Sequence, residues 1–556
     1  MKKLLCMLMS LTMVFCAASC RGRGDNGNGE EPIDHTKTQL YVANYDSGFG
    51  SEWLKKTIAR FVEDYKDYSF EEGKTGVQVY TRFDKSFYGK SLLSSIEGST
   101  YDVYFTEGFF YYNFVADNKL LDITDIVTQP LTKYGETKSI EDKLSPERKD
   151  FFKVNGSTYY ALPHFEAVTG IIYDMDLFDE KEYYFAKNKE NMNDGFTSKS
   201  SGEELAYGPD NLPDTEDDGL PATYEDFFKL CDRMKSDGII PICWNGIATE
   251  YLTDFAKSLA ADYDGKEETM LNFTFDGTAD IVTGFNGNTP ITEEVEINPS
   301  NGYRLAQQAG KYYALQFIDK LVSGKYYRDG SFSQGVSHTD NQSIFLRSKL
   351  DTQTPTVAMM IDGTWWENEA TNSGAYDSLV KQFGPRASRD RRHFGFMPFP
   401  KATEAQLGSQ WTVWELFNSA GFIKASIPQN RVEIAKTFLQ YCHTQQSLAE
   451  FSVETNTMKA FNYSLDDEQS KLSNWGKQMY NLHSAAAWVT PYAQNQMYLH
   501  SAEIKWESQV DGAPYNNPAR DIMDKGATVN GKKWFTGMAT VNSQSYWNTF
   551  AKYFNN

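Results

Sequence analysis

The chain has 556 residues, of which 40% are hydrophobic and 15% are aromatic. A single hydrophobic core stops growing at about 250–300 residues, so we expect at least two lobes, and the composition excludes a small binding module or a disordered protein. The formal net charge of −21 opposes contact with a phosphate backbone or an anionic lipid surface, so we expect no nucleic-acid partner.

The first 19 residues have the organisation of a secretory signal peptide. Two lysines precede an apolar run over residues 4–15, and small residues then lead into Cys20. The run is shorter than the roughly 20 residues that a membrane-spanning helix needs. Small residues directly before a cysteine resemble a lipobox, although Ala17 stands where lipoboxes usually carry Leu. We therefore expect lipidation of Cys20, with an ordinary signal peptide as the alternative.

The segment after Cys20 is rich in Gly, Asn and charged residues, which predicts a flexible tether over residues 20–38. No second stretch of 18 or more apolar residues follows, so membrane contact is expected through the lipid anchor only. The other cysteines are Cys231, Cys243 and Cys442, without C-x-x-C spacing. They allow either a Cys231–Cys243 bridge or three buried free thiols.

From residue 39 the pattern alternates between strand and helix. Residues 40–44 and 77–83 predict strands, and the segment that begins at Ser51 between them has apolar residues at helical spacing. This β-α-β unit implies a parallel sheet. A further strand is expected over 102–105, followed directly by Glu107, at the end of the sheet where open α/β sheets bind ligands. Helices are expected over 91–96, 110–118, 311–322 and 431–442, and helix should exceed strand.

Residues 181–221 are polar and acidic, so we expect an inserted surface loop there. Thr223 and Asp226 then have the spacing of a capping box at the start of a helix. Within the insert, Asp210, Asp214, Asp217 and Asp218 are candidate ligands of a structural calcium ion, because closely spaced carboxylates suit a hard cation. The alternative is a solvated acidic loop. No other cofactor is expected.

Several short segments occur in an order that resembles the carbohydrate-specific extracellular solute-binding proteins typified by maltose-binding protein. They are Asp102–Glu107 with Asn118–Asp125, Ala161–Glu166 with Gly170–Phe178, Pro221–Phe228, Met359–Trp365, Phe394–Pro400 and Ser419–Ser426. Each segment alone is weak evidence, and the ordered set is strong. The chain is far longer than maltose-binding protein, with extra sequence before Pro221 and over 261–301, so the resemblance does not imply which sugar is bound.

The resemblance implies a periplasmic-binding-protein-like α/β fold with two discontinuous lobes and a ligand cleft between them. Residues 39–165 and 418–462 would form the N-terminal lobe, and residues 166–417 and 463–556 the C-terminal lobe. It further implies a monomer that binds a carbohydrate, closes on it and delivers it to the permease subunits of an ABC importer. The protein would lie on the outer face of the cell membrane, in the periplasm if the host is Gram-negative.

A sugar site needs aromatic rings against the apolar faces of the pyranose and carboxylates or amides for its hydroxyls. The tryptophans on segments that match the family's cleft are Trp365, Trp366, Trp411 and Trp414, and less firmly Trp244 and Trp488. The polar candidates are Glu107, Glu166 and Asp362. The competing interpretations are buried core tryptophans, a solvated loop for Glu107, a hinge salt bridge for Glu166 and an orienting role for Asp362 toward the Trp365 loop.

Catalytic motifs are missing from the sequence. There is no G-x-S-x-G and no H-E-x-x-H, and Gly89-Lys90-Ser91 lacks the earlier glycine of a phosphate loop. We therefore expect no enzyme, although the paired carboxylates of a glycoside hydrolase cannot be recognised in a single sequence. The alternatives are a surface glycan-capture lipoprotein of the helical-repeat type and a secreted glycoside-active enzyme.

The anchor prediction can be tested at Cys20. The substitution Cys20→Ala removes the predicted attachment site, so we expect the protein to leave the membrane fraction while its ligand binding stays intact. Fractionation and immunoblotting measure the release. Metabolic labelling of the unmutated protein with a fatty-acid analogue is the direct check, and an absence of incorporated label would contradict the lipoprotein prediction.

Overall fold

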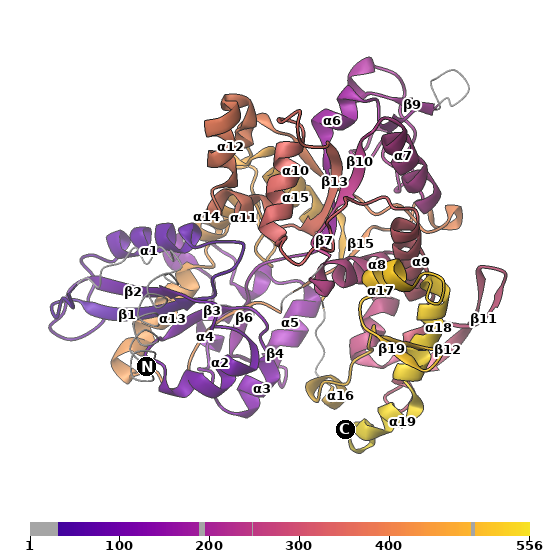
Figure 1. Cartoon of the computed structure of the whole chain (residues 1–556). Coiled ribbons are helices and arrows are strands. Elements are labelled where there is room, and N and C mark those ends of the chain that lie inside the picture. Colours follow the sequence, from indigo (N-terminus) through magenta and orange to yellow (C-terminus); the bar gives the residue numbers. More distant parts are fainter. Residues whose placement is uncertain (1–31, 188–194, 247, 417, 491–494, 556) are drawn as a thin grey trace, which may run out of the picture.

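The computed structural model describes residues 32–187, 195–246, 248–416, 418–490 and 495–555. The predicted signal peptide, Cys20 and most of the tether lie outside these residues. The described chain forms two α/β lobes, each with its own sheet and hydrophobic core, and a smaller unit beside the second lobe (Figure 1). None of its helices is both long and apolar enough to cross a membrane.

The N-terminal lobe is built on a five-stranded sheet. Its strand order is β2 (Val77–Phe83), β1 (Thr38–Asn44), β3 (Val103–Thr106), β16 (Ala420–Ile423) and β6 (Ala161–Pro163). Strand β1 pairs in parallel with β2 and with β3, which confirms the predicted β-α-β opening. Strand β16 is antiparallel to both of its neighbours. The chain therefore returns to this lobe after building the other one.

Helices pack on both faces of this sheet (Figure 1). They are α1 (Glu52–Asp64), α2 (Gly89–Ser95), α3 (Tyr111–Ala116), α4 (Thr124–Thr128), α5 (Pro146–Phe152), α13 (Val432–Tyr441) and α14 (Gln445–Thr455). Helix α1 buries Leu54 and Phe61, at the helical spacing that the sequence shows. Phe61 packs edge to face against Phe438 of α13, so the returning segment completes the core of the lobe.

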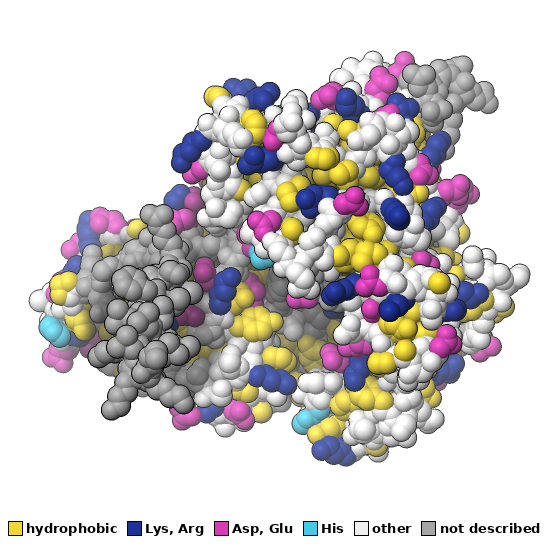
Figure 2. Space-filling view, in the orientation of Figure 1, with side chains coloured by type: hydrophobic (Ala, Val, Ile, Leu, Met, Phe, Trp, Pro, Cys, Tyr) yellow, Lys and Arg dark blue, Asp and Glu magenta, His cyan; other side chains and the backbone are white. Residues whose placement is uncertain are grey.

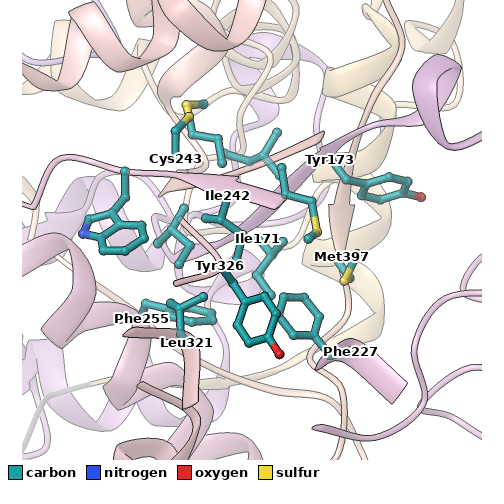
Figure 3. Packing of buried hydrophobic residues seen from close by; sticks show 14 of the residues in the cluster. Ile171, Tyr173, Phe227, Ile242, Cys243, Phe255, Leu321, Tyr326 and Met397 are labelled. Atoms are coloured by element: carbon teal, nitrogen blue, oxygen red, sulfur yellow. The ribbon is translucent and has the colours of Figure 1, made fainter. Parts of the chain in front are cut away.

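The C-terminal lobe has a four-stranded mixed sheet. Its strand order is β10 (Ile240–Cys243), β13 (Val357–Gly363), β7 (Thr169–Asp174) and β14 (Phe394–Met397). Every residue of β7, β13 and β14 is buried, as expected for strands covered on both faces. Figure 3 shows Ile171 and Ile242 of the sheet packed with Phe227, Phe255 and Leu321 of the surrounding helices.

The helices of this lobe include one with the predicted capping box. They are α6 (Met175–Glu180), α7 (Tyr224–Ser236), α8 (Thr249–Thr274), α9 (Ala309–Ser323), α10 (His338–Ser348), α11 (Trp366–Asn372), α12 (Ala375–Phe383), α15 (Asn474–Ala485), α17 (Pro518–Lys525) and α18 (Gly531–Val541). At α7, Thr223 Oγ1 accepts from the Asp226 amide at 3.2 Å, and the Asp226 carboxylate accepts from the Thr223 amide at 3.2 Å. The capping-box prediction is confirmed.

Both inserted regions contain paired strands. In the first, β8 (Tyr184–Phe185) and β9 (Phe196–Thr197) pair, and Tyr184, Phe185 and Phe196 are buried in the C-terminal core. The prediction of a polar surface loop over 181–221 is wrong for this part, because these few aromatic residues suffice to anchor it to the lobe. In its acidic half, residues 211–216 lie at or near the surface, whereas Asp217 and Leu220 are buried.

The second insert continues into a separate small core. After α8, the hairpin of β11 (Gly277–Asn286) and β12 (Thr289–Ile297) packs with α16 (Gln496–Leu499) and α19 (Gln544–Trp547). Trp547 and Phe275 are fully buried there, with ring centroids 5.2 Å apart. The last segment of the chain therefore closes this unit, visible in yellow beside the hairpin in Figure 1.

The structure has three buried free thiols, at Cys231, Cys243 and Cys442. The alternative of a Cys231–Cys243 bridge is therefore not formed. Cys231 and Cys243 belong to the C-terminal core and Cys442 to the N-terminal core. Burial raises the pKa of each thiol, which keeps these cysteines protonated and unreactive.

The complete burial of Trp366 in the C-terminal core leads to a prediction about stability. The ring has no exposed surface and packs against Phe394 and Trp475 at centroid distances of 5.1 and 5.6 Å. Trp366→Ala should lower the free energy of unfolding by about 3–5 kcal/mol, because a large cavity is left. Chemical denaturation measures the loss. Ile291→Ala, at a half-exposed side chain on the hairpin, should change stability by less than about 0.5 kcal/mol; equal losses in the two variants would contradict the assignment.

Candidate ligand-binding site

A cleft of about 590 Å³ lies where the two lobes meet. Its walls come from the segment after β3, from Phe151 of α5 and from Asn418 in the N-terminal lobe, and from α8, Trp414 and residues between 498 and 516. This volume lies within the range of about 300–1,000 Å³ that is typical of small-molecule sites. On the face seen in Figure 2, lysine and arginine side chains are dispersed among acidic and uncharged ones, without a basic patch.

Aromatic rings line much of this cleft. Phe273 packs edge to face on Trp414 at 5.2 Å and approaches Tyr498 at 6.1 Å. On the opposite wall, Phe110 is 37% exposed, although its residue type is usually buried, and Lys90 Nζ lies 5.4 Å from its ring. An exposed aromatic ring opposite a cluster of others can cover the apolar face of a sugar.

Carboxylates also gather at the boundary between the two lobes, outside the lining of this cleft. Glu107 follows β3, and Asp362 lies near the end of β13, so each sheet presents one acid at the boundary. Gln342 of α10 donates its amide to Asp362 Oδ2 at 3.1 Å and to Glu369 Oε2 at 2.7 Å. The other Glu369 oxygen lies 3.1 Å from His338 Nε2.

The pKa values of these acids are raised. Burial is the main cause of the shift at Glu107 and raises its pKa to about 8. The Glu369 charge acts in the same direction, and a hydrogen bond from Ser47 acts in the opposite direction. Burial, followed by the Glu369 charge, raises the pKa of Asp362 to about 7. Acids whose pKa values are shifted by burial and by a neighbouring charge are candidates for a functional site.

Trp365 joins the two lobes at this boundary. It directly follows the β13 turn of the C-terminal lobe, but its ring packs into the hydrophobic core of the N-terminal lobe. A Cβ atom on Gly48 would lie 2.5 Å from Cδ1 of Trp365, so the close approach of the indole requires glycine at that position. Asn368 also donates to the Gly48 carbonyl at 2.9 Å. Tyr251 of α8 lies beside the indole, with ring centroids 6.5 Å apart.

The segments that pass between the lobes lie side by side and bond to one another. The amide of Leu416 donates to Ala167 O at 2.8 Å, and the amide of Glu166 donates to Met458 O at 3.0 Å. Ser419 Oγ contacts both the amide and the carbonyl of Phe165, at 3.1 and 3.2 Å. Backbone pairing across three passing segments makes a narrow hinge behind the cleft.

A buried charge network holds this hinge. Arg148 of α5 contacts Glu166 Oε1 at 2.9 Å with Nη1 and Glu415 Oε2 at 2.7 Å with Nη2. His483 Nδ1 of α15 lies 2.6 Å from the other Glu166 oxygen. Burial opposes the ionisation of Glu166, but His483 and Arg148 outweigh burial, and the pKa of Glu166 is lowered. Both oxygens of Glu166 thus contact protein groups, as in the hinge alternative considered for this residue.

The tryptophans singled out in the sequence lie in different surroundings. Trp365 lies at the lobe boundary, packed into the N-terminal core, and Trp414 lines the cleft. Trp244 and Trp366 are completely buried in the C-terminal core, so a ligand cannot reach their rings in this conformation. Trp411 packs on Phe396 and Phe399 of that core, and Trp488 is also half-buried against it.

The acidic insert uses its carboxylates within its own turns. The Asp217 carboxylate accepts from the Asp210 amide at 3.1 Å and from Thr215 Oγ1 at 2.6 Å, and the Asp218 carboxylate accepts from the Asp214 amide at 2.8 Å. Among the described residues, no group of three or more His, Cys, Asp or Glu side chains is arranged to hold a metal ion. Calcium in this loop stays a prediction.

Sequence reasoning missed several residues of the site. Tyr251, His338 and Glu369 reach it from three helices, and no spacing in the sequence connects them. Phe110 could have been found, because residues 109–112 are four consecutive aromatic residues directly after Glu107 and Gly108. Four aromatic residues in succession at the start of a helix cannot all face one core, so at least one of them is expected at the surface.

No protein-family model matches the chain, and no curated protein is similar to it in sequence. Solved structures do share its fold. A chitin oligosaccharide binding protein matches with a TM-score of 0.53 and 15% identity, covering 93% of this chain and 100% of its own. BlMnBP1, a binding protein of an ABC transporter from Bifidobacterium animalis subsp. lactis, solved with mannobiose, matches with a TM-score of 0.53 and 15% identity, covering 94% and 95%.

The bacterial solute receptor AcbH, described as preferring β-D-galactopyranose, matches with a TM-score of 0.50 and 13% identity, covering 92% of this chain and 98% of its own. The chain therefore has the two-lobed α/β fold of the sugar-binding solute receptors. The predicted fold class and the resemblance to these receptors are confirmed at the level of the fold.

The hinge network generates a prediction at Arg148. Arg148→Met leaves the buried Glu166 and Glu415 carboxylates without their shared cation, so the free energy of unfolding should fall by about 3–5 kcal/mol. Urea unfolding at neutral pH measures this. Arg82→Met removes an arginine from an exposed pair with Asp84 and should cost less than about 1 kcal/mol. If both substitutions cost the same small amount, the hinge network does not stabilise the fold.

Proposed function

We propose that this chain is the extracytoplasmic substrate-binding protein of an ABC sugar importer. A carbohydrate binds in the cleft between the lobes and favours the closed state, which delivers it to membrane permease subunits. The protein is anchored to the outer face of the membrane by a lipid on Cys20 and works as a monomer, without a catalytic role.

The observation that carries this proposal is the interlobe cleft itself, within the fold of sugar receptors. Its lining includes the exposed ring of Phe110 and the half-buried ring of Trp414, and the buried carboxylates of Glu107 and Asp362 lie at the lobe boundary outside that lining. Rings for the apolar faces of a pyranose and carboxylates for its hydroxyls are the two chemistries that carbohydrate recognition needs. The matched structures are binding proteins that include receptors for chitin oligosaccharides and mannobiose.

The two alternative functions, a helical-repeat glycan-capture protein and a glycoside-active enzyme, make different predictions. A helical-repeat glycan-capture protein would have little sheet, whereas two sheets with parallel pairs form the cores of this chain. A glycoside-active enzyme is tested directly, by incubating the protein with labelled oligosaccharides and analysing the products. Cleavage or transglycosylation products would contradict the proposal of a pure binding protein.

A thermal-shift screen over mono- and oligosaccharides is the first experiment. A bound ligand at 100 times its Kd stabilises the folded state by about 2.7 kcal/mol, which a melting curve resolves. Small-angle scattering with and without the ligand found then measures whether the lobes close. If no saccharide shifts the melting temperature, sugar binding is contradicted.

The adjacent tryptophans 365 and 366 form a matched pair for the binding test. Trp365→Ala should weaken sugar binding by about 1–3 kcal/mol, or roughly 5- to 150-fold, because the indole that joins the two lobes beside the cleft is lost. Trp366→Ala should leave the affinity of the folded protein near normal despite its lower stability. Calorimetric titration and melting curves on both variants measure the two effects. Near-normal affinity in Trp365→Ala would remove that ring from the site.

A further inference from the structure

Helix α11 of the C-terminal lobe docks on a turn of the N-terminal lobe that contains two glycines. A Cβ atom on Gly48 would lie 2.5 Å from Trp365 Cδ1 and 3.5 Å from Glu369 Cβ. A Cβ atom on Gly50 would lie 2.3 Å from Asn372 Nδ2. These three contacts come from successive turns along one side of α11. We call this contact between the 48–50 turn and α11 the interlobe latch.

Three carboxyl groups from the two lobes surround the latch. Glu107 belongs to the N-terminal lobe and accepts a hydrogen bond from Ser47, the residue before the glycine turn. Asp362 and Glu369 belong to the C-terminal lobe, and the charge of Glu369 acts on both other acids. Glu107 and Asp362 are 5% and 2% exposed. Negative charges that meet in such a dry contact repel each other, so the latch is sensitive to their ionisation.

His338 brings positive charge to this cluster from α10. Its Nε2 lies 3.1 Å from Glu369 Oε1, and this hydrogen bond is the main cause that raises the pKa of the histidine, against burial. The histidine also acts on Asp362, and Lys85 of the N-terminal lobe acts on the histidine. The titratable groups with raised pKa values that surround the acids, and are therefore neutral, are Tyr45, Tyr88, Tyr251 and Cys243.

A buried lysine contacts His164, which lines a small pocket together with Glu107. Lys459 Nζ lies 2.7 Å from His164 Nδ1, and 4.6 and 5.2 Å from the ring centroids of Trp53 and Phe105. Burial lowers the pKa of this lysine to about 7 and that of the histidine well below its usual value. All these groups belong to the N-terminal lobe, so separation of the lobes leaves their contacts in place.

We propose that acid closes the latch: protons on Glu107 and Asp362 hold the lobes together, and their loss releases α11 from the 48–50 turn. In the latched form both carboxyl groups are buried and face the charge of Glu369, so the neutral carboxylic acid fits the contact better than the carboxylate. When the lobes separate, water reaches the carboxyl groups and the distance between the charges of the two lobes grows. The latch acts on the empty protein and does not rest on a bound sugar.

The direction of the pH dependence follows from the two acids. In the latched form, burial raises the pKa of Glu107 to about 8 and that of Asp362 to about 7. In the open form we expect both pKa values to lie nearer their ordinary values of about 4. The latched form therefore binds more protons, and its advantage is complete below the ordinary pKa values and is lost as the pH rises toward 8. Each linked proton changes the ratio of open to latched protein by up to about tenfold per pH unit.

The test measures small-angle scattering of the full chain without ligand at pH 6 and pH 8. The ratio of open to compact protein should rise about 10-fold or more between these values. The double substitution Glu107→Gln with Asp362→Asn mimics the protonated acids, so this variant should be compact at both pH values, with a change of about threefold or less. Glu268→Gln is the matched control, because burial also raises the pKa of this acid to about 8, but it contacts the Asp280 amide of β11. It should open like the unmutated protein.

A second variant tests the geometry of the latch without changing a charge. Gly48→Ala places a methyl group against Trp365, so this variant should be open at both pH values. Melting curves at pH 6 check that each variant is folded. A compact Gly48→Ala variant at pH 6 would show that the glycine turn does not hold the lobes together.

The remaining outcomes decide the role of the acids. Opening at pH 8 that the double substitution abolishes and Glu268→Gln preserves supports the latch. Unmutated protein with the same dimensions at pH 6 and pH 8 overturns it, as does pH-dependent opening that survives the double substitution. Because no saccharide is present, failure of the latch leaves the sugar-binding proposal standing, and failure of every saccharide to bind leaves the latch to be decided by scattering alone.

Discussion

Two buried carboxylates, Glu166 and Glu415, share one guanidinium where the chain passes between the lobes. A chain that leaves a lobe and returns to it must bring its crossing segments together in a small dry volume, and charged groups there are costly unless they are fully paired. Arg148 meets this constraint from the N-terminal lobe and His483 from the C-terminal lobe. Each crossing segment is fixed relative to its neighbours, so the cleft in front of them has a defined width.

The boundary between the lobes is built from different parts of the chain. The buried carboxylates of Glu107 and Asp362 lie near the ends of strands, where the architecture of an open sheet puts polar groups. The aromatic walls of the cleft come from helices and from the late segment around Tyr498, outside both sheets. The sheets thus fix the position of the two acids, and α8 and the C-terminal segments give the cleft its shape.

The sequence predicted the frame better than the site. Strand β2 has the predicted bounds, and the Thr223 capping box is present, because both follow from local periodicity and spacing. Trp365 and Trp366 are adjacent and chemically identical, yet one crosses the lobe boundary and the other is buried in its own lobe. That distinction depends on which helices and strands surround the turn after β13. The sequence near the two tryptophans carries no information about those tertiary neighbours. Tyr251 and Glu369 were missed for the same reason.

Trp365 belongs to one lobe by sequence and to the core of the other by packing. Any motion that separates the lobes at this end withdraws the indole from apolar surroundings and hydrates it together with the surface that it covered. Hydration of apolar surface carries a positive heat capacity. The free energy of such an opening would therefore be curved in temperature, and the fluorescence of the same ring would report on it.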